Sequence, residues 1–180
     1  MKILIINGND GDPVLDDYIH EYTEFLKQKG MTVKAHELRN AMIKQCVECC
    51  ACMVKTPGIC ALKDGQQTIL SDYLTADAVV IFTTLRAGFM NSLTKRFLDR
   101  LFPLELPFID FKNGKMHHKL RYVKYPKMGF VFKPEAGTDT EDIELNNTYA
   151  QHVGEYYSEL LFANTTETEI QELANETISI

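Results

Sequence analysis

The chain lacks the long apolar run that a membrane segment needs. No stretch of its 180 residues approaches the roughly 20 apolar residues of a transmembrane helix. The N-terminal apolar run, from Ile3 to Ile6, is too short for the core of a signal peptide and has no small-residue cleavage site after it. These absences lead us to expect a cytoplasmic protein without a membrane partner.

An excess of basic residues is also absent. Lys and Arg number 19 against 25 Asp and Glu, which gives a formal net charge of −6. This is the wrong sign for attraction to a phosphate backbone or to anionic lipid, so we expect no nucleic-acid partner. Internal repeats, linkers and low-complexity segments are not found either. The length fits one domain, and we expect residues 1–180 to form it.

Cysteine is missing from most of the chain and concentrated in one stretch. Cys46, Cys49, Cys52 and Cys60 have the spacing C-x2-C-x2-C-x7-C, and Cys50 is wedged among them. Because disulfides are uncommon in the cytoplasm, clustered cysteines there more often bind a metal or do redox chemistry.

The spacing leaves several kinds of site open. Cysteines at successive x2 intervals wrap one face of a polynuclear centre, and a further cysteine after a longer reach completes an iron–sulfur cubane. Zinc sites more often divide their ligands into two C-x2-C pairs far apart in the sequence. A zinc ion, a redox disulfide, and reduced thiols without a cofactor remain alternatives. Cys50 does not fit the spacing and is not counted among the ligands.

Outside this stretch, strand patterns alternate with helix patterns. Apolar β-branched runs predict strands over 2–7, 31–36, 77–83, 128–133 and 160–164. Helical spacing predicts helices over 14–29, 66–75, 139–158 and 167–177, and a helical stripe over 89–101 that overlaps a loop over 85–91. The cysteine-rich loop at 40–64 and an insertion at 102–126 are predicted to be irregular.

Such alternation predicts a parallel sheet covered on both faces, with five strands in the order 2-1-3-4-5. In this order the ligand crevice lies at the carboxyl ends of strands 1, 3 and 4, where the winding reverses. The loops that meet there are 8–13, 84–89 and 133–138.

The first two loops contain the candidate cofactor-binding residues. Glycines in the first loop allow backbone amides to turn toward a phosphate at the following helix. Acidic residues crowd the same place, so an ordinary acidic helix start is the alternative there. The second loop offers a hydroxyl, a cation and an aromatic ring. The candidates are Gly8, Asn9, Asp10, Gly11, Thr84, Leu85, Arg86, Ala87, Gly88 and Phe89.

Together these motifs resemble the NADPH-dependent FMN reductase-like group, which includes the iron–sulfur flavoproteins. The resemblance rests on the Asn-Gly-Asn loop, on the cysteine stretch with Thr-Pro-Gly, and on DAVVIFTT. It also rests on the blocks KRFLDRLFPLELPFI (95–109) and NGKMHHKLRYVKYP (113–126), and it covers nearly the whole chain.

The resemblance implies a flavodoxin-like three-layer α/β/α sandwich, non-covalent FMN in the crevice, and NAD(P)H as co-substrate. It also implies a homo-oligomer, either a dimer or a tetramer. In the iron–sulfur branch, a similar cysteine motif holds a [4Fe-4S] cluster, and the matching ligands are Cys46, Cys49, Cys52 and Cys60.

We therefore predict an FMN-dependent NAD(P)H oxidoreductase that passes electrons to a small-molecule or protein acceptor. No catalytic acid or base is assigned, because hydride transfer to a flavin needs none. One alternative is an electron carrier that does not react with NAD(P)H. Another is a flavodoxin-fold module that has lost flavin binding and uses the cysteine loop for a structural metal or a partner.

Overall fold

Strands and helices alternate along most of the chain, as the sequence predicts. A computed structural model describes residues 1–112 and 114–179. The strands are β1 (Lys2–Gly8), β2 (Thr32–Glu37), β3 (Ala78–Arg86), β4 (Phe89–Met90), β5 (Glu105–Lys112), β6 (Lys115–Leu120), β7 (Lys127–Lys133) and β8 (Leu160–Thr165). The helices are α1 (Pro13–Gln28), α2 (Ala51–Val54), α3 (Gln66–Thr75), α4 (Ser92–Leu98), the 3-10 helix η1 (Phe102–Leu104), α5 (Thr140–Tyr157) and α6 (Ile170–Ile178).

The central sheet has the order β2-β1-β3-β7-β8, and all four pairings are parallel. The predicted order 2-1-3-4-5 is therefore confirmed. β1 pairs with β3 in a register that places Ile3 opposite Ala78 and Gly8 opposite Thr83. This aligns the carboxyl ends of the central strands at one edge, the place where the winding reverses.

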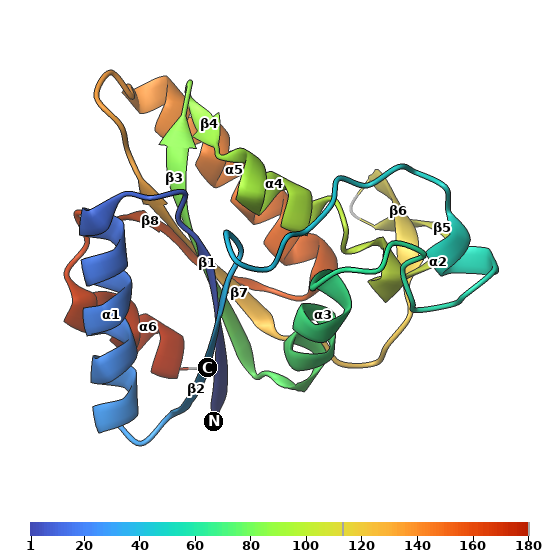
Figure 1. Cartoon of the computed structure of the whole chain (residues 1–180), viewed down its shortest axis with the longest axis horizontal. Helices are drawn as coiled ribbons and strands as arrows, with labels where there is room; N and C mark the ends of the chain where they lie inside the picture. Colours follow the sequence, from blue (N-terminus) through green and yellow to red (C-terminus); the bar gives the residue numbers. More distant parts are fainter. Residues whose placement is uncertain (113, 180) are drawn as a thin grey trace.

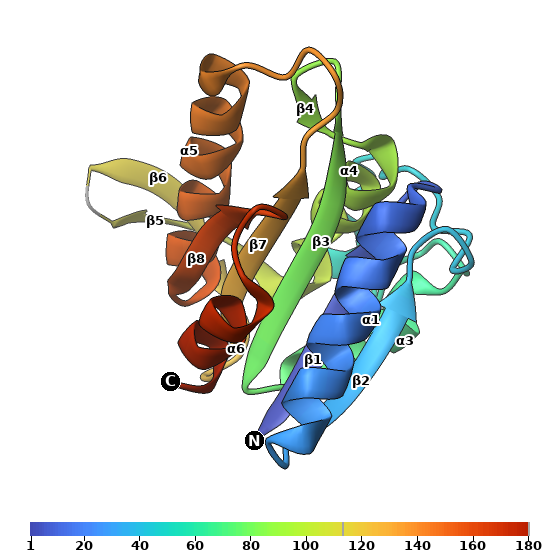
Figure 2. The ribbon, with the colours of Figure 1, turned by 90° about the vertical axis from the view of Figure 1, so that its left-hand side faces the viewer.

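Helices cover both faces of the sheet and make three layers (Figures 1 and 2). Along β1, Ile3 and Ile5 pack in one apolar core with residues of α1 and α6. Leu4 and Ile6 point the other way, into a core shared with α3, α4 and α5. Because both faces are buried, β1 is continuously apolar from Ile3 to Ile6 and does not alternate with polar residues there. In the part of the chain that the structure describes, no helix is both long and apolar enough to cross a membrane.

Two irregular regions of the prediction are wrong. The insertion at 102–126 contains an antiparallel hairpin, β5–β6, which forms its own two-stranded sheet. The dipeptide Asn113-Gly114, a common hairpin signal, stands between its strands in the sequence. The predicted loop at 85–91 is shortened because β3 continues to Arg86 and β4 pairs back on it. Phe89 and Met90 therefore lie in a strand, and the helix starts only at Ser92.

A buried carboxyl group joins the hairpin to the sandwich. Glu105, at the start of β5, is 5% exposed and accepts a hydrogen bond from the Tyr157 hydroxyl at the end of α5. Burial raises the pKa of Glu105, although the bond from Tyr157 and the nearby His118 oppose this effect.

We expect Glu105→Gln to make the protein less sensitive to pH. The folded-state pKa of Glu105 lies above its ordinary value of 4.5, so the stability that the protonated group contributes is complete below that value. It is lost as the pH rises through the folded-state pKa. The amide oxygen of Gln can still accept the Tyr157 bond without a charge. Urea unfolding at pH 4.5 and pH 7 should show Glu105→Gln gaining stability over the wild type at the higher pH. An unchanged difference would contradict a buried titrating carboxyl.

Candidate functional site

Three loops meet at the carboxyl edge of the sheet, after β1, β3 and β7 (Figure 1). They are bridged by hydrogen bonds between side chains and backbone. Gly8 ends β1 at the centre of this edge, where a β-carbon would stand 2.1 Å from Thr94 Oγ1 and 2.7 Å from the carbonyl oxygen of Phe82. Close packing against α4 and β3 therefore requires glycine at this position.

The first loop is held by its own side chains. Asn9 is fully buried; its Oδ1 accepts the backbone N–H groups of Gly11 at 3.0 Å and Asp12 at 2.8 Å. Its Nδ2 donates to the Asp12 carbonyl at 2.6 Å. Asp12 caps α1 by accepting the N–H groups of Val14 and Leu15 at 2.8 and 3.1 Å. The loop thus has the tight backbone turn of the prediction, with these amides directed at protein oxygens.

Asp10 links the first loop to the second. Its carboxylate accepts hydrogen bonds from Arg86 Nε at 2.9 Å, from Arg86 Nη2 at 2.8 Å and from Thr84 Oγ1 at 2.8 Å. The bonds from Arg86 hold the pKa of Asp10 below its ordinary value, against the opposing effect of burial. The structure thus brings together three predicted residues, Asp10, Thr84 and Arg86. Their polar groups bond to one another, which leaves fewer of them for a ligand.

The second loop is also tied to the third. Arg86 Nη1 lies 3.5 Å from Glu135 Oε2, and the N–H of Ala87 donates to Glu135 Oε1 at 2.6 Å. Ala87 has φ 50° and Gly88 has φ 79°, so the chain turns sharply here. A β-carbon at Gly88 would lie 2.3 Å from Asp142 Oδ1 at the start of α5. Backbone shape and a close approach both favour glycine at 88.

The last two predicted residues of this loop have packing contacts. Leu85 is fully buried in the core, and the ring of Phe89 packs edge-on against Tyr149 with centroids 5.4 Å apart. The sequence prediction missed Asn91, whose Nδ2 donates to the Gly8 carbonyl at 2.6 Å and to Thr84 Oγ1 at 2.7 Å. It also missed Glu135 as a partner of Arg86, since a single glutamate in a loop has no distinguishing sequence pattern.

The five cysteines all line one pocket of about 240 Å³. Helix α2, which contains Cys52, lies beside the β5–β6 hairpin and on the opposite side of the molecule from α1 (Figure 1). All five thiols are free; Cys52 is buried, Cys46 and Cys60 are partly exposed, and Cys49 and Cys50 are exposed. Phe102 and His118 complete one side of the pocket. Among the described residues, no group of three or more His, Cys, Asp or Glu side chains is arranged to hold a metal ion.

The backbone around these cysteines has unusual dihedral angles. Glu48 and Cys50 have φ values of 49° and 52°, in the left-handed region. Each such residue without glycine's freedom costs about 1–2 kcal/mol. The two turns lie among the cysteines and fold the segment back, so that the thiols share the pocket. Strain of this kind tends to occur at functional sites.

A buried cation stands next to the cysteine pocket. Arg100, which follows α4, is 1% exposed and forms an ion pair with Asp64. Its Nη1 also donates to the Lys44 carbonyl at 3.0 Å, whereas its buried Nε and Nη2 have no hydrogen-bond partner. Burial lowers the pKa of Arg100, but Asp64 and the neighbouring thiol of Cys60 raise it overall. For the Cys52 thiol, burial has the opposite effect and raises the pKa to about 11. The charges of Cys60, Cys46 and Cys49 add to this increase.

His118 also has a buried polar atom without a hydrogen-bond partner. Its Nδ1 is buried without a hydrogen-bond partner, and its ring packs edge-on against Phe102 with centroids 6.4 Å apart. The sequence placed His118 in a basic run and gave no sign that the hairpin turns it toward the cysteines. The missing information is the pairing of β5 with β6, which fixes the direction of the side chain.

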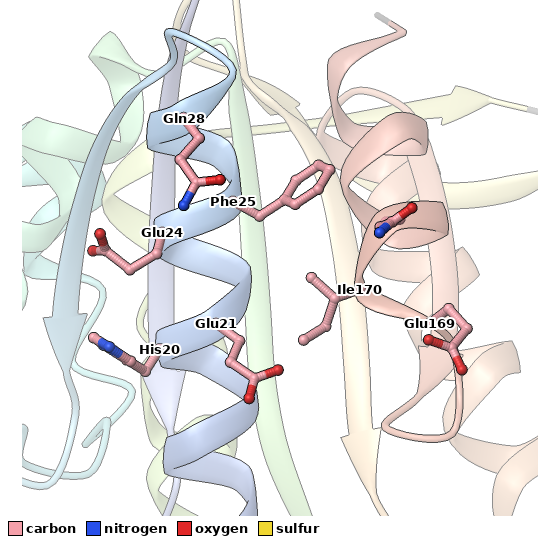
Figure 3. A pocket seen from close by; sticks show the side chains of 8 residues that line it. His20, Glu21, Glu24, Phe25, Gln28, Glu169 and Ile170 are labelled. Carbon is pink, nitrogen blue, oxygen red and sulfur yellow. The ribbon is translucent and has the colours of Figure 1, made fainter.

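A shallow groove lies between α1 and α6 (Figure 3). Phe25 and Ile170 point toward one another across it, whereas His20 and Glu24 point away from α6. The lining includes Glu21, Glu24 and Glu169. The groove lies in the outer helical layer, away from both the crevice and the cysteines.

With this geometry described, comparison with known proteins gives a consistent result. The sequence model of the family "NADPH-dependent FMN reductase" matches residues 1–122. An iron-sulfur flavoprotein from Archaeoglobus fulgidus is 31% identical over 100 residues, covering 56% of this chain and 48% of that protein. An iron-sulfur flavoprotein from Methanocaldococcus jannaschii is 27% identical over 100 residues, covering 56% of this chain and 50% of that protein. The chain thus spans about half the length of the curated relatives it matches.

The fold has solved counterparts. An NAD(P)H:quinone oxidoreductase from Methanothermobacter marburgensis superposes with a TM-score of 0.68 at 12% identity, covering 99% of this chain and 94% of that one. At this level of identity the similarity shows the fold, which is the flavodoxin-like sandwich that the sequence resemblance implied.

We expect Arg100→Met to destabilise the protein by about 3–5 kcal/mol, because it leaves Asp64 buried without its counter-charge. Arg96→Met is the matched control, since Arg96 lies in α4 and bonds the Ile43 carbonyl without a buried ion pair. Its loss should be about 1 kcal/mol. The measurement is the free energy of unfolding in urea for both variants. Equal losses would contradict a special role for the buried pair.

Proposed function

Because the chain belongs to the NADPH-dependent FMN reductase family, we propose that it is an FMN-dependent NAD(P)H oxidoreductase that uses a [4Fe-4S] cluster on its cysteine segment. A small-molecule or protein acceptor would receive the electrons. The observation that carries the cluster is the shared pocket, in which the four spaced cysteines meet beside a buried guanidinium with unused donors.

The donor set suits an anionic iron–sulfur cluster. Cys46, Cys49, Cys52 and Cys60 would be the ligands, once their side chains rotate toward the centre of the pocket. Thiolates are the ligands that iron–sulfur clusters take, and hydrogen bonds to the sulfurs tune the reduction potential. Arg100 Nε and Nη2 and His118 Nδ1 would supply such bonds and would otherwise stay unsatisfied. A bound cluster would supply one-electron chemistry.

The flavin would lie in the crevice at the carboxyl edge of the sheet. Residues 84–89, joined to residues 133–138 by Ala87 and Glu135, would flank the ring, with Gly8, Asn9, Asp10 and Gly11 on the opposite side. A bound flavin would supply hydride and single-electron chemistry. The phosphate side of this crevice fits a flavin phosphate poorly, since the loop amides and Arg86 are bonded to protein oxygens.

That mismatch supports a second function. The same hydrogen bonds would suit a module of the family that has lost flavin binding and keeps the cysteine segment for a structural metal, such as zinc, or for a partner protein. The two functions differ in colour and metal content, which makes them easy to separate.

We propose further that the protein is a homo-oligomer. Figure 2 shows the β5–β6 hairpin standing out from the sandwich, and it exposes Phe108, Phe111 and Met116 by 61%, 74% and 66%. Helix α2 of the cysteine segment lies beside this hairpin and away from the carboxyl ends of β1 and β3 in the same chain (Figure 1). A second copy on the hairpin would cover the apolar side chains and bring another crevice toward the cysteines.

Freshly purified, oxygen-free protein should show flavin absorbance and contain about four irons and four sulfides per chain. Cys52→Ser should lose most of the iron, because it removes a ligand. Cys50→Ser, the matched control, should retain it, because Cys50 stands outside the ligand spacing. Zinc in place of iron, or a colourless protein after incubation with FMN, would support the second function instead.

Phe111→Ser should shift the oligomer toward monomer, because it removes the most exposed aromatic side chain of the hairpin. Ile59→Ser is the control, since Ile59 is 48% exposed but lies outside the hairpin. Light scattering coupled to gel filtration measures the mass over a dilution series. A wild-type protein that is monomeric at every concentration would contradict the proposed assembly.

A further inference from the structure

The place where a ligand phosphate would meet α1 is built around protein oxygens. Anions bind at helix N-termini through backbone N–H groups that have no partner within the helix. Here the N–H groups of Gly11 and Asp12 donate to Asn9 Oδ1, and those of Val14 and Leu15 donate to Asp12 Oδ1. The N–H of Asn9 donates to Asn7 Oδ1 at 2.8 Å. A phosphate would have to displace these acceptors to use the same donors.

The cation of the crevice is also engaged. Arg86 makes two bonds to Asp10, in the bidentate geometry that guanidinium groups make with carboxylates and phosphates alike. Its remaining terminal nitrogen faces Glu135. Thr84 Oγ1, a hydroxyl that could donate to a ligand, donates to the same Asp10 carboxylate. One guanidinium thus stands between two carboxylates, so the local charge is negative.

We propose that Asp10 fills, with its own carboxylate, the place of a ligand phosphate, so that the crevice binds flavins without selecting for the phosphate group. The Asp10 carboxylate accepts the hydrogen bonds of the Thr84 hydroxyl and of Arg86 Nε and Nη2, so these donors are not available to a ligand phosphate. Asp10 is thereby a specificity-determining residue, and the preferred ligand class is a flavin with an uncharged polyol chain. This proposal rests on the proposed flavin site.

Charge and hydrogen bonding favour this class of ligand. A phosphate dianion would meet Asp10, Asp12 and Glu135 within one loop cluster. Repulsion between like charges a few ångströms apart corresponds to about tenfold in affinity at a partly solvated site. The hydroxyls of a ribityl chain carry no charge and can donate to the oxygens of Asp10 and Glu135. A neutral chain therefore keeps the three loops bridged, whereas a phosphate breaks the bridge.

The test compares the dissociation constants of riboflavin and FMN, which differ only in the phosphate group. Equilibrium dialysis at one fixed ionic strength should give a wild-type dissociation constant for riboflavin that is no higher than the constant for FMN. Asp10→Asn keeps the size of the side chain and removes its charge, so FMN should bind about tenfold tighter while riboflavin changes little. Asp17→Asn, an equal change in charge at an exposed position of α1, should alter neither constant.

Several results would overturn the proposal. One is a wild-type protein that binds FMN about tenfold or more tighter than riboflavin, since the phosphate would then contribute about 1.4 kcal/mol or more. Another is an Asp10→Asn variant that gains no affinity for FMN. Binding of neither flavin to any of the three proteins would instead overturn the proposed flavin site, and this inference with it. The wild-type ratio needs no variant, so the test stands even if Asp10→Asn folds poorly.

Discussion

The buried ion pair between Arg100 and Asp64 determines where the cysteines stand. Lys44 and Asp64 bracket the cysteine segment, and Arg100 Nη1 bonds both the Lys44 carbonyl and the Asp64 carboxylate. Asp64 Oδ2 also accepts the N–H of Lys44 at 3.0 Å. Separating the two ends would leave a buried charge without its partner, which is strongly unfavourable. The ends of this segment are therefore held together by the ion pair and its hydrogen bonds. Regular secondary structure contributes little, since the segment contains only the short helix α2.

The same guanidinium connects stability to chemistry. A side chain that is 1% exposed and has two nitrogens without partners is costly unless something else bonds them. The cysteine pocket lies next to this guanidinium, and Cys60 is close enough to raise the pKa of Arg100. Arg121 adds a second support, since its Nη2 bonds the Cys52 carbonyl at 3.4 Å and the Glu105 carbonyl at 2.7 Å. Two arginines from outside the segment thus position its backbone.

The sequence was sufficient for the sheet, because the strands follow from local patterns. Runs such as DAVVIFTT identify a strand buried on both faces, and the cysteine spacing marks its segment directly. The hairpin was missed because Pro107 and the charged residues of β5 and β6 hide the strand pattern. The bond between Asp10 and Arg86 joins residues 76 positions apart, and no local pattern encodes such a contact. The acidic loop was visible in the sequence, but its partner was not.

The two Arg–Asp pairs show why the residue type alone does not define an anion site. Arg86 is 46% exposed, yet its donors are directed at Asp10 and Glu135, so little of its capacity remains for a ligand. Arg100 is buried and paired, yet two of its nitrogens have no partner. The buried arginine therefore has more free hydrogen-bond donors than the exposed one. By this criterion the proposed anionic cluster would find free donors beside the cysteines, whereas the crevice would offer few donors to a ligand phosphate.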